Sequence, residues 1–141
     1  MRGDMDVDGA SVIRKEVAHR RHSCVGSSRT AVTRASARRE LFLSSLTAWE
    51  IATLVRRGRL STAVSAQALV NQLFSHPGVR EVPVDREIGL VAGTLLDGFH
   101  GDPADRLIVA TAIVRGLRLM TRDRRILDYA RRTRAVPTIA C

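Results

Sequence analysis

The sequence predicts a three-layer α/β/α fold with a central parallel sheet. Short apolar runs alternate with amphipathic stretches of helical length, which is the pattern of repeated strand–helix units. Several of these stretches begin with a capping residue and end close to a glycine. The chain has 141 residues and 45% hydrophobic residues, so it is long enough for one domain with one core.

The first 37 residues are expected to form an atypical basic segment, and residues 38–141 are expected to form the folded domain. Eight basic residues and one acid lie between Arg14 and Arg39, with few large apolar residues among them. This stretch predicts no core element, although its alanines and arginines favour a helix from about Thr30 to Arg39. The first strand of the sheet has no clear counterpart in it.

From residue 40 onward the strand and helix signals are clear. Up to residue 84 they predict a buried strand, two helices and a short extended segment: Leu41–Leu43, Thr47–Val55, Thr62–Phe74 and Glu81–Val84. Beyond residue 84 they predict two helices, a strand, a helix and a last strand: Asp85–Leu96, Asp102–Val114, Leu117–Met120, Asp123–Arg132 and Val136–Ile139.

The net charge of +9 comes almost entirely from arginine, because Lys15 is the only lysine. Arginine codons of a GC-rich genome explain this charge as well as a phosphate-binding surface does. Cys24 and Cys141 lie far apart and near no histidine cluster, so neither a disulfide framework nor a zinc site is expected. No run of eighteen apolar residues and no secretory signal is present, so we expect a cytoplasmic protein without a membrane partner.

Acidic residues stand where predicted strands pass into helices. Glu50 follows the first strand, Asp102 and Asp105 open a helix, and Asp123 follows the strand Leu117–Met120. Functional groups collect at the carboxyl ends of parallel strands. Acids that converge there repel one another unless a cation joins them, and carboxylate oxygens suit Mg²⁺ or Mn²⁺. Such an ion supports phosphodiester cleavage.

Each acid also has a purely structural interpretation. Thr47 and Glu50 form a T-x-x-E capping box. Asp102 before a proline is a natural N-cap, and Asp105 in the first turn complements the helix dipole. Asp123 can cap the last helix. The residues alone therefore leave capping and metal binding as open alternatives.

Three motifs resemble those of PIN-domain ribonucleases of the VapC toxin type. The segments are SSLTAWEIA at 44–52, DPADRLIVATA at 102–112 and LMTRD at 119–123. The run RRGRL at 56–60 is also similar to this subgroup. The resemblance covers about residues 38–141, and the motifs occur in the family's order with similar spacing.

The resemblance implies an endoribonuclease that depends on Mg²⁺ or Mn²⁺ and acts as the toxin of a type II toxin–antitoxin system. It implies RNA and a cognate antitoxin as partners, and a homodimer is expected. Cleavage would leave a 3′-hydroxyl and a 5′-phosphate. By this resemblance, Glu50, Asp105 and Asp123 are the metal-site and catalytic acids. Asp102 and Thr121 would be accessory residues, and Arg106 and Arg122 would contact the RNA phosphate.

The N-terminus departs from the family pattern of an apolar strand that ends in aspartate. Asp8 stands 42 residues before Glu50, a compatible spacing for a fourth metal-site and catalytic acid, but charged residues precede it. Three functions stay open: an active ribonuclease, a catalytically degenerate PIN domain that serves as an antitoxin-binding or interaction module, and a basic RNA-binding protein without metal. Trp49 is expected in the core or in a dimer interface rather than as a base-stacking platform.

Overall fold

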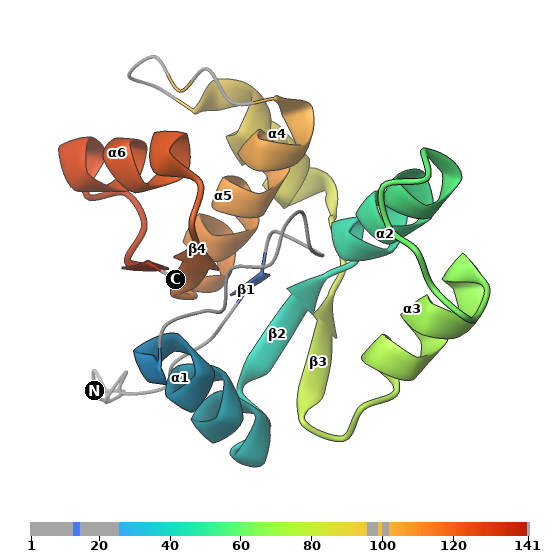
Figure 1. Cartoon of the computed structure of the whole chain (residues 1–141). Helices are drawn as coiled ribbons and strands as arrows, with labels where there is room; N and C mark the ends of the chain where they lie inside the picture. Colours follow the sequence, from blue (N-terminus) through green and yellow to red (C-terminus); the bar gives the residue numbers. More distant parts are fainter. Residues whose placement is uncertain (1–12, 15–25, 96–98, 100–101, 141) are drawn as a thin grey trace.

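Parallel strands alternate with helices in the computed structural model, which describes residues 13–14, 26–95, 99 and 102–140 (Figure 1). The strands are β1 Ile13–Arg14, β2 Leu41–Ser44, β3 Val79–Val82, β4 Leu119–Thr121 and β5 Thr138–Ala140. The helices are α1 Gly26–Ala37, α2 Leu46–Arg56, α3 Ala66–Phe74, α4 Arg86–Thr94, α5 Pro103–Arg115 and α6 Arg124–Thr133. The predicted α/β class is confirmed.

All the strand pairs in the described residues are parallel. β4 lies between β1 and β5, with Ile13 opposite Leu119 and Leu119 opposite Thr138. β2 pairs with β3, and Leu41 lies opposite Val79. β1 also lies against β2, so it occupies the centre between the two sheet pieces. The carboxyl ends of the strands therefore share one edge, from which α2 and α6 begin.

Adjacent residues of the strands send their side chains to opposite faces, and each face has its own helices. Phe42 and Leu119 join the larger core, which Ile88 of α4, Ile108 of α5 and Ile126 of α6 complete. Leu41, Met120 and Ile139 instead pack with Val32 and Ala35 of α1. This division produces the three predicted layers, with α1 on one side of the sheet and α4, α5 and α6 on the other.

Helix α1 corrects the expectation that the basic stretch contributes no core element. Ala35 of this helix is only 1% exposed. A Cβ atom built on Gly78, in the turn before β3, would lie 2.6 Å from the Ser36 carbonyl oxygen. The helix thus packs closely by means of small residues, which carry almost no hydrophobic signal in the sequence.

The other predicted elements are present, with shifted ends. Helix α3 begins at Ala66 rather than near Thr62, because the Ser65 side chain caps it by accepting a hydrogen bond from Ala68 N–H at 3.1 Å. Helix α4 begins after the predicted cap Asp85, whose carboxylate accepts from Ile88 N–H at 3.0 Å. Among the described helices, none is both long and apolar enough to cross a membrane.

Candidate active site

Helix α5 separates the roles of its two acids. Asp102 is the N-cap: its Oδ1 atom accepts a hydrogen bond from Asp105 N–H at 2.8 Å, and Pro103 occupies the first helical position. The predicted cap is therefore confirmed. Asp105, in the third position of the helix, is only 3% exposed, whereas Asp102 is exposed. The two carboxylates lie one turn apart but in contrasting environments.

Helix α2 shows that the capping-box interpretation of Glu50 is wrong. The N-cap residue is Ser45, and its side chain makes no capping hydrogen bond. Its hydroxyl oxygen instead accepts from Val84 N–H at 3.1 Å and so joins α2 to the segment after β3. Glu50 lies in the second turn, too far along the helix to satisfy its first N–H groups.

Thr47, the other residue of the supposed capping box, lies inside α2. Its side chain is buried, and its Oγ1 atom has no hydrogen-bond partner among the described residues. Thr47 precedes Glu50 by three residues, so the two side chains lie on adjacent parts of the helix surface. A buried hydroxyl without a partner is costly to the fold, so this position fits a bound polar ligand.

The junction of β4 and α6 is held by Thr121 and Asp123. The buried Thr121 hydroxyl oxygen accepts a hydrogen bond from Asp123 N–H at 3.1 Å. The Oδ1 atom of Asp123 accepts from Arg125 N–H at 2.8 Å, which confirms the predicted N-cap. Its Oδ2 atom makes no hydrogen bond to a described residue. Asp123 can therefore cap α6 with one oxygen and present the other to a ligand.

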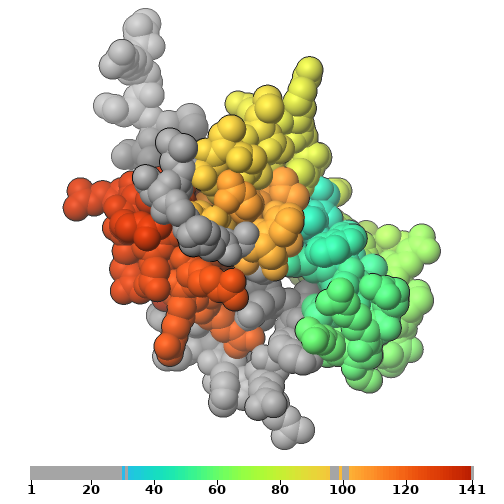
Figure 2. Space-filling view, turned by 90° about the horizontal axis from the view of Figure 1, so that it is seen from above, coloured from blue at the N-terminus to red at the C-terminus, as the bar shows by residue number. Residues whose placement is uncertain are grey.

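Glu50, Asp105 and Asp123 come from three different elements, α2, α5 and the junction of β4 with α6. Helices α2 and α5 pack against each other, which brings together the helices that carry Glu50 and Asp105. Asp123 directly follows β4. Figure 2, which views the molecule from above, shows α2, α5 and α6 at its upper end. Within the described ranges, however, no three His, Cys, Asp or Glu side chains form a group that could hold a metal ion.

The candidate fourth acid, Asp8, lies outside the described residues. Strand β1 begins at Ile13, five positions after Asp8 in the sequence. The family pattern instead expects the aspartate at the end of this strand. Glu16 is the first acid that follows β1 in the sequence.

Arg106 binds backbone carbonyl groups. Its Nε atom donates to Ala92 O and its Nη1 atom to Phe99 O, each at 2.8 Å, and Nη2 donates to Gly93 O and Leu95 O at 3.3 and 3.4 Å. These contacts hold the C-terminal end of α4 against the first turn of α5. They leave one N–H of the guanidinium for any other partner, so the geometry favours a structural role over the predicted phosphate contact.

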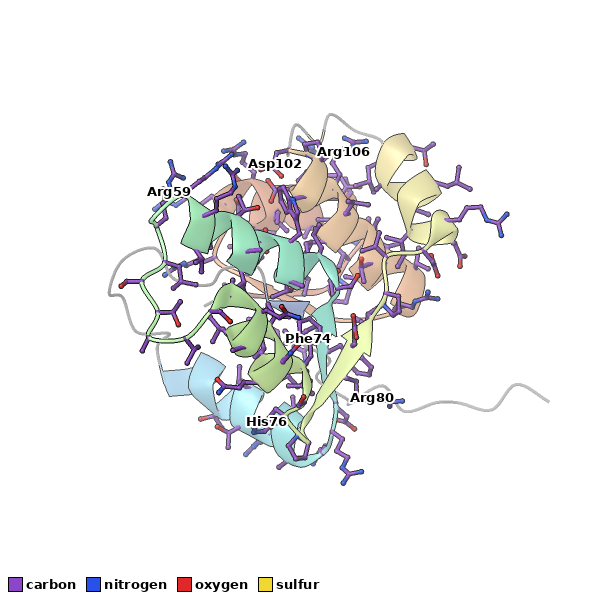
Figure 3. All side chains as sticks on the ribbon, turned by 90° about the vertical axis from the view of Figure 1, so that its right-hand side faces the viewer. Arg59, Phe74, His76, Arg80, Asp102 and Arg106 are labelled. Atoms are coloured by element: carbon purple, nitrogen blue, oxygen red, sulfur yellow. The ribbon has the colours of Figure 1, made fainter. Side chains whose placement is uncertain are left out.

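The segment that Arg106 holds also contacts α6. The Phe99 ring packs on Tyr129 with ring centroids 4.8 Å apart. Figure 3 places Asp102 and Arg106 together at the upper end of the molecule, far from His76 in the turn before β3. Arg106 thus joins α5 to the end of α4 and to the segment that contacts α6. The sequence contained this residue in a motif but gave no sign that its partners would be carbonyl groups.

Arg122 and Trp49 each stand next to a candidate acid in the sequence. Arg122, between Thr121 and Asp123, is half-buried, and its phosphate contact stays a prediction. Trp49, next to Glu50, is 58% exposed, so it does not belong to the core.

Comparisons with known proteins identify a family and similar chains. The PIN domain family profile matches residues 25–132, which includes helix α1. Ribonuclease VapC22 of Mycobacterium tuberculosis is 40% identical over 90 residues, which cover 64% of this chain and 68% of that protein. A solved structure of FitAB bound to a DNA fragment aligns with a TM-score of 0.49 and 22% identity over 71% of this chain and 72% of that chain.

The family match spans most of the chain and contains Glu50, Asp105 and Asp123. The relative is well above 30% identity over two thirds of its own length. The resemblance inferred from the three motifs is therefore confirmed, and the chain belongs to the PIN-domain family, as a member of the VapC type.

Proposed function

We propose that the protein is a metal-dependent endoribonuclease and the toxin of a type II toxin–antitoxin pair in the cytoplasm. The family match and the relative named a ribonuclease support this proposal. The structural observation that carries it is the burial of Asp105. RNA and a cognate antitoxin are its proposed partners, and a homodimer is its proposed state.

A carboxylate that only serves a helix terminus has no need of burial. Asp102 already caps α5 from an exposed position, so the helix gains little from a second acid in the same turn. Asp105 is nevertheless buried, on a helix that packs against the one that carries Glu50. A buried acid at the start of a helix, where parallel strands end, stands where a functional carboxylate is expected.

The side chains at this edge suit a hard divalent cation, either Mg²⁺ or Mn²⁺. Glu50, Asp105 and Asp123 would supply carboxylate oxygens, and the unpartnered Thr47 hydroxyl would supply a neutral oxygen. The described acids do not form a three-ligand group by themselves. On this proposal an acid of the N-terminal residues, with Asp8 as the candidate, completes the set.

The chain's own groups would organise the cleavage. When bound, Mg²⁺ or Mn²⁺ supplies an activated water and neutralises charge on the departing oxygen. Thr121 fixes the backbone at Asp123, and that bond sets the direction of the carboxylate. Arg122 would bind the phosphate beside it. Arg106 would act only by holding Asp105 and its helix in place.

A second candidate is the catalytically degenerate module that binds an antitoxin. The absence of a three-acid group among the described residues favours it. Calorimetric titration of the full chain with Mn²⁺, followed by an RNA cleavage assay with and without EDTA, separates the two. We expect Mn²⁺ binding and cleavage that EDTA abolishes. A chain that binds no Mn²⁺ and cleaves no RNA would exclude the ribonuclease.

The identity of the first acid requires its own comparison. Asp8→Asn and Glu16→Gln change the acids that precede and follow β1 in the sequence. Each variant removes one charge and keeps side-chain size. We expect Asp8→Asn to weaken Mn²⁺ binding and cleavage, with Glu16→Gln as the matched control. The reverse result would remove Asp8 from the site without excluding the activity.

A further inference from the structure

The single tryptophan of the chain lies exposed beside a candidate catalytic acid. Trp49 keeps 58% of its surface accessible, although an indole ring is normally well buried. It directly precedes Glu50 on α2, so its side chain is rotated about 100° from that acid around the helix. A ligand on Trp49 would therefore border the candidate active site.

The exposed side of α2 carries both this indole and a positively charged side chain. Trp49, Ala52, Thr53 and Arg56 recur at intervals of three and four residues and so share one side of the helix, named here the Trp49 face. Ala52 and Arg56 are exposed. Arg56 stands two turns, about 10 Å, beyond Trp49.

The end of the Trp49 face is strongly basic. Arg56, Arg57 and Arg59 are all exposed, and none of them forms a salt bridge with a described residue. Figure 3 places Arg59 toward the upper end of the molecule, the same end as Asp102. Helix α2 rises to that end from the tip of β2 (Figure 1). The positive charge therefore lies at the same end of the molecule as the start of α5.

We propose that the Trp49 face binds single-stranded RNA, with one base stacked on the Trp49 ring and neighbouring phosphates on Arg56 and Arg57. An aromatic side chain that every base can stack on, together with cations that follow the backbone, is the means by which proteins hold single strands. The inference rests on the proposed ribonuclease function, and it adds an RNA subsite outside the acidic residues.

A protein partner suits this face less well. A stable protein interface buries about 800 Å² on each partner around an apolar centre. The Trp49 face has one large apolar side chain, flanked by a small alanine and a half-buried threonine. Three arginines that form no salt bridge with a described residue would also have to lose water on contact with protein, whereas phosphate neutralises them directly.

The fluorescence of Trp49 tests the inference directly, because no other tryptophan contributes to the signal. The full chain is titrated with a short single-stranded oligouridylate in EDTA, so that no metal-dependent cleavage takes place. We expect quenching that saturates with RNA, and weaker quenching by a duplex of the same length. In fluorescence anisotropy with labelled RNA, Trp49→Ala should lower affinity at least about fivefold, and Trp49→Phe should largely preserve it.

Matched variants separate the face from the general charge of the protein. Arg56→Ala should reduce the slope of log affinity against log salt by about 0.7, the value for one phosphate contact on a single strand. Arg86→Ala and Leu90→Ala alter an exposed arginine and an exposed leucine of α4 and should leave affinity unchanged. Equal losses with Arg86→Ala would overturn the proposal, because they indicate non-specific attraction.

The fluorescence test of the Trp49 face does not depend on whether the protein cleaves RNA. RNA cleavage without Trp49 quenching would overturn the proposed subsite and leave the proposed function intact. Quenching without cleavage would support the subsite and count against the ribonuclease. A Trp49 signal that changes with protein concentration and not with RNA would assign the face to a second copy of the chain and would also overturn the proposal.

Discussion

At the scale of single residues, the site depends on which polar groups the fold already uses. Asp102 and Asp123 each cap a helix, and Arg106 is engaged with four carbonyl groups. Asp102 already caps α5, so a cap does not account for Asp105, and Thr47 Oγ1 has no partner in the described part of the chain. Asp105, Thr47 and the second carboxylate oxygen of Asp123 are therefore the candidates for contact with a ligand.

Arg106→Lys should lower the free energy of unfolding by at least about 2 kcal/mol. Lysine keeps the charge but not the planar fork that reaches several carbonyl oxygens, and hydrogen bonds from a charged donor each contribute about 1.5–3 kcal/mol. Urea denaturation measures the change. Arg86→Lys, at an exposed arginine, is the control and should be neutral. Equal midpoints for the two variants would show that the carbonyl contacts contribute nothing to the fold.

Asp85 should make stability depend on pH at the acidic end. The hydrogen bond from Ile88 N–H, followed by Arg115, lowers the pKa of Asp85 below its ordinary value. A lowered pKa means that the ionised form stabilises the fold above about pH 4, the usual aspartate pKa, and that this contribution disappears as pH falls through the folded-state pKa. Asp85→Asn should thus be less stable than wild type near neutral pH, and the two melting temperatures should converge in acid. A constant difference from pH 7 to pH 2 would contradict this assignment.

At the scale of elements, helix α1 shows how small residues position a layer. Its contact with the turn before β3 exists because Gly78 has no Cβ atom. That contact holds α1 over the face of the sheet that Met120 and Leu41 present. The helix therefore covers β4, the strand that leads to Thr121 and Asp123.

Gly78→Ala should destabilise the protein by about 1–3 kcal/mol, the usual cost of overpacking. The added carbon would lie 2.6 Å from the Ser36 carbonyl oxygen, so α1 must move away. Gly89→Ala is the matched control, because a Cβ atom there meets nothing within 4 Å inside helix α4. It should raise stability by about 0.5–1 kcal/mol. Thermal melting that shows the same sign for both variants would refute the close contact.

The elements that carry caps and periodic apolar residues could be predicted from the sequence. Asp85, Asp102 and Asp123 each cap the helix expected of them. Helix α1 escaped detection as a core element because it packs through alanine and serine against a glycine. The capping box at Thr47 was wrong because the chain enters α2 two residues earlier, at Ser45. The residue at which a helix begins and the residues that it buries depend on tertiary contacts, which the local sequence pattern does not contain.

At the scale of the whole molecule, topology gathers residues that are far apart in sequence. Parallel pairing places the carboxyl ends of β2 and β4 at one edge, so Glu50 and Asp123 approach it from motifs 73 residues apart. The sequence predicted this edge, and the gathering of its acids into one metal site stays a prediction. It did not predict the exposed indole at Trp49 or the carbonyl contacts of Arg106, since exposure and hydrogen-bond partners are properties of the packed molecule.

We expect Asp105 to serve the chemistry, whereas Asp102 serves the helix. Asp105→Asn and Asp102→Asn make the same change one turn apart, and asparagine caps helices about as well as aspartate. Mn²⁺-dependent RNA cleavage and thermal melting of both variants against wild type provide the test. We expect Asp105→Asn to lose cleavage but to stay folded, because the amide keeps the size of the carboxylate and lacks the charge that holds a hard cation, whereas Asp102→Asn should keep both cleavage and stability. Full cleavage by Asp105→Asn would contradict this expectation.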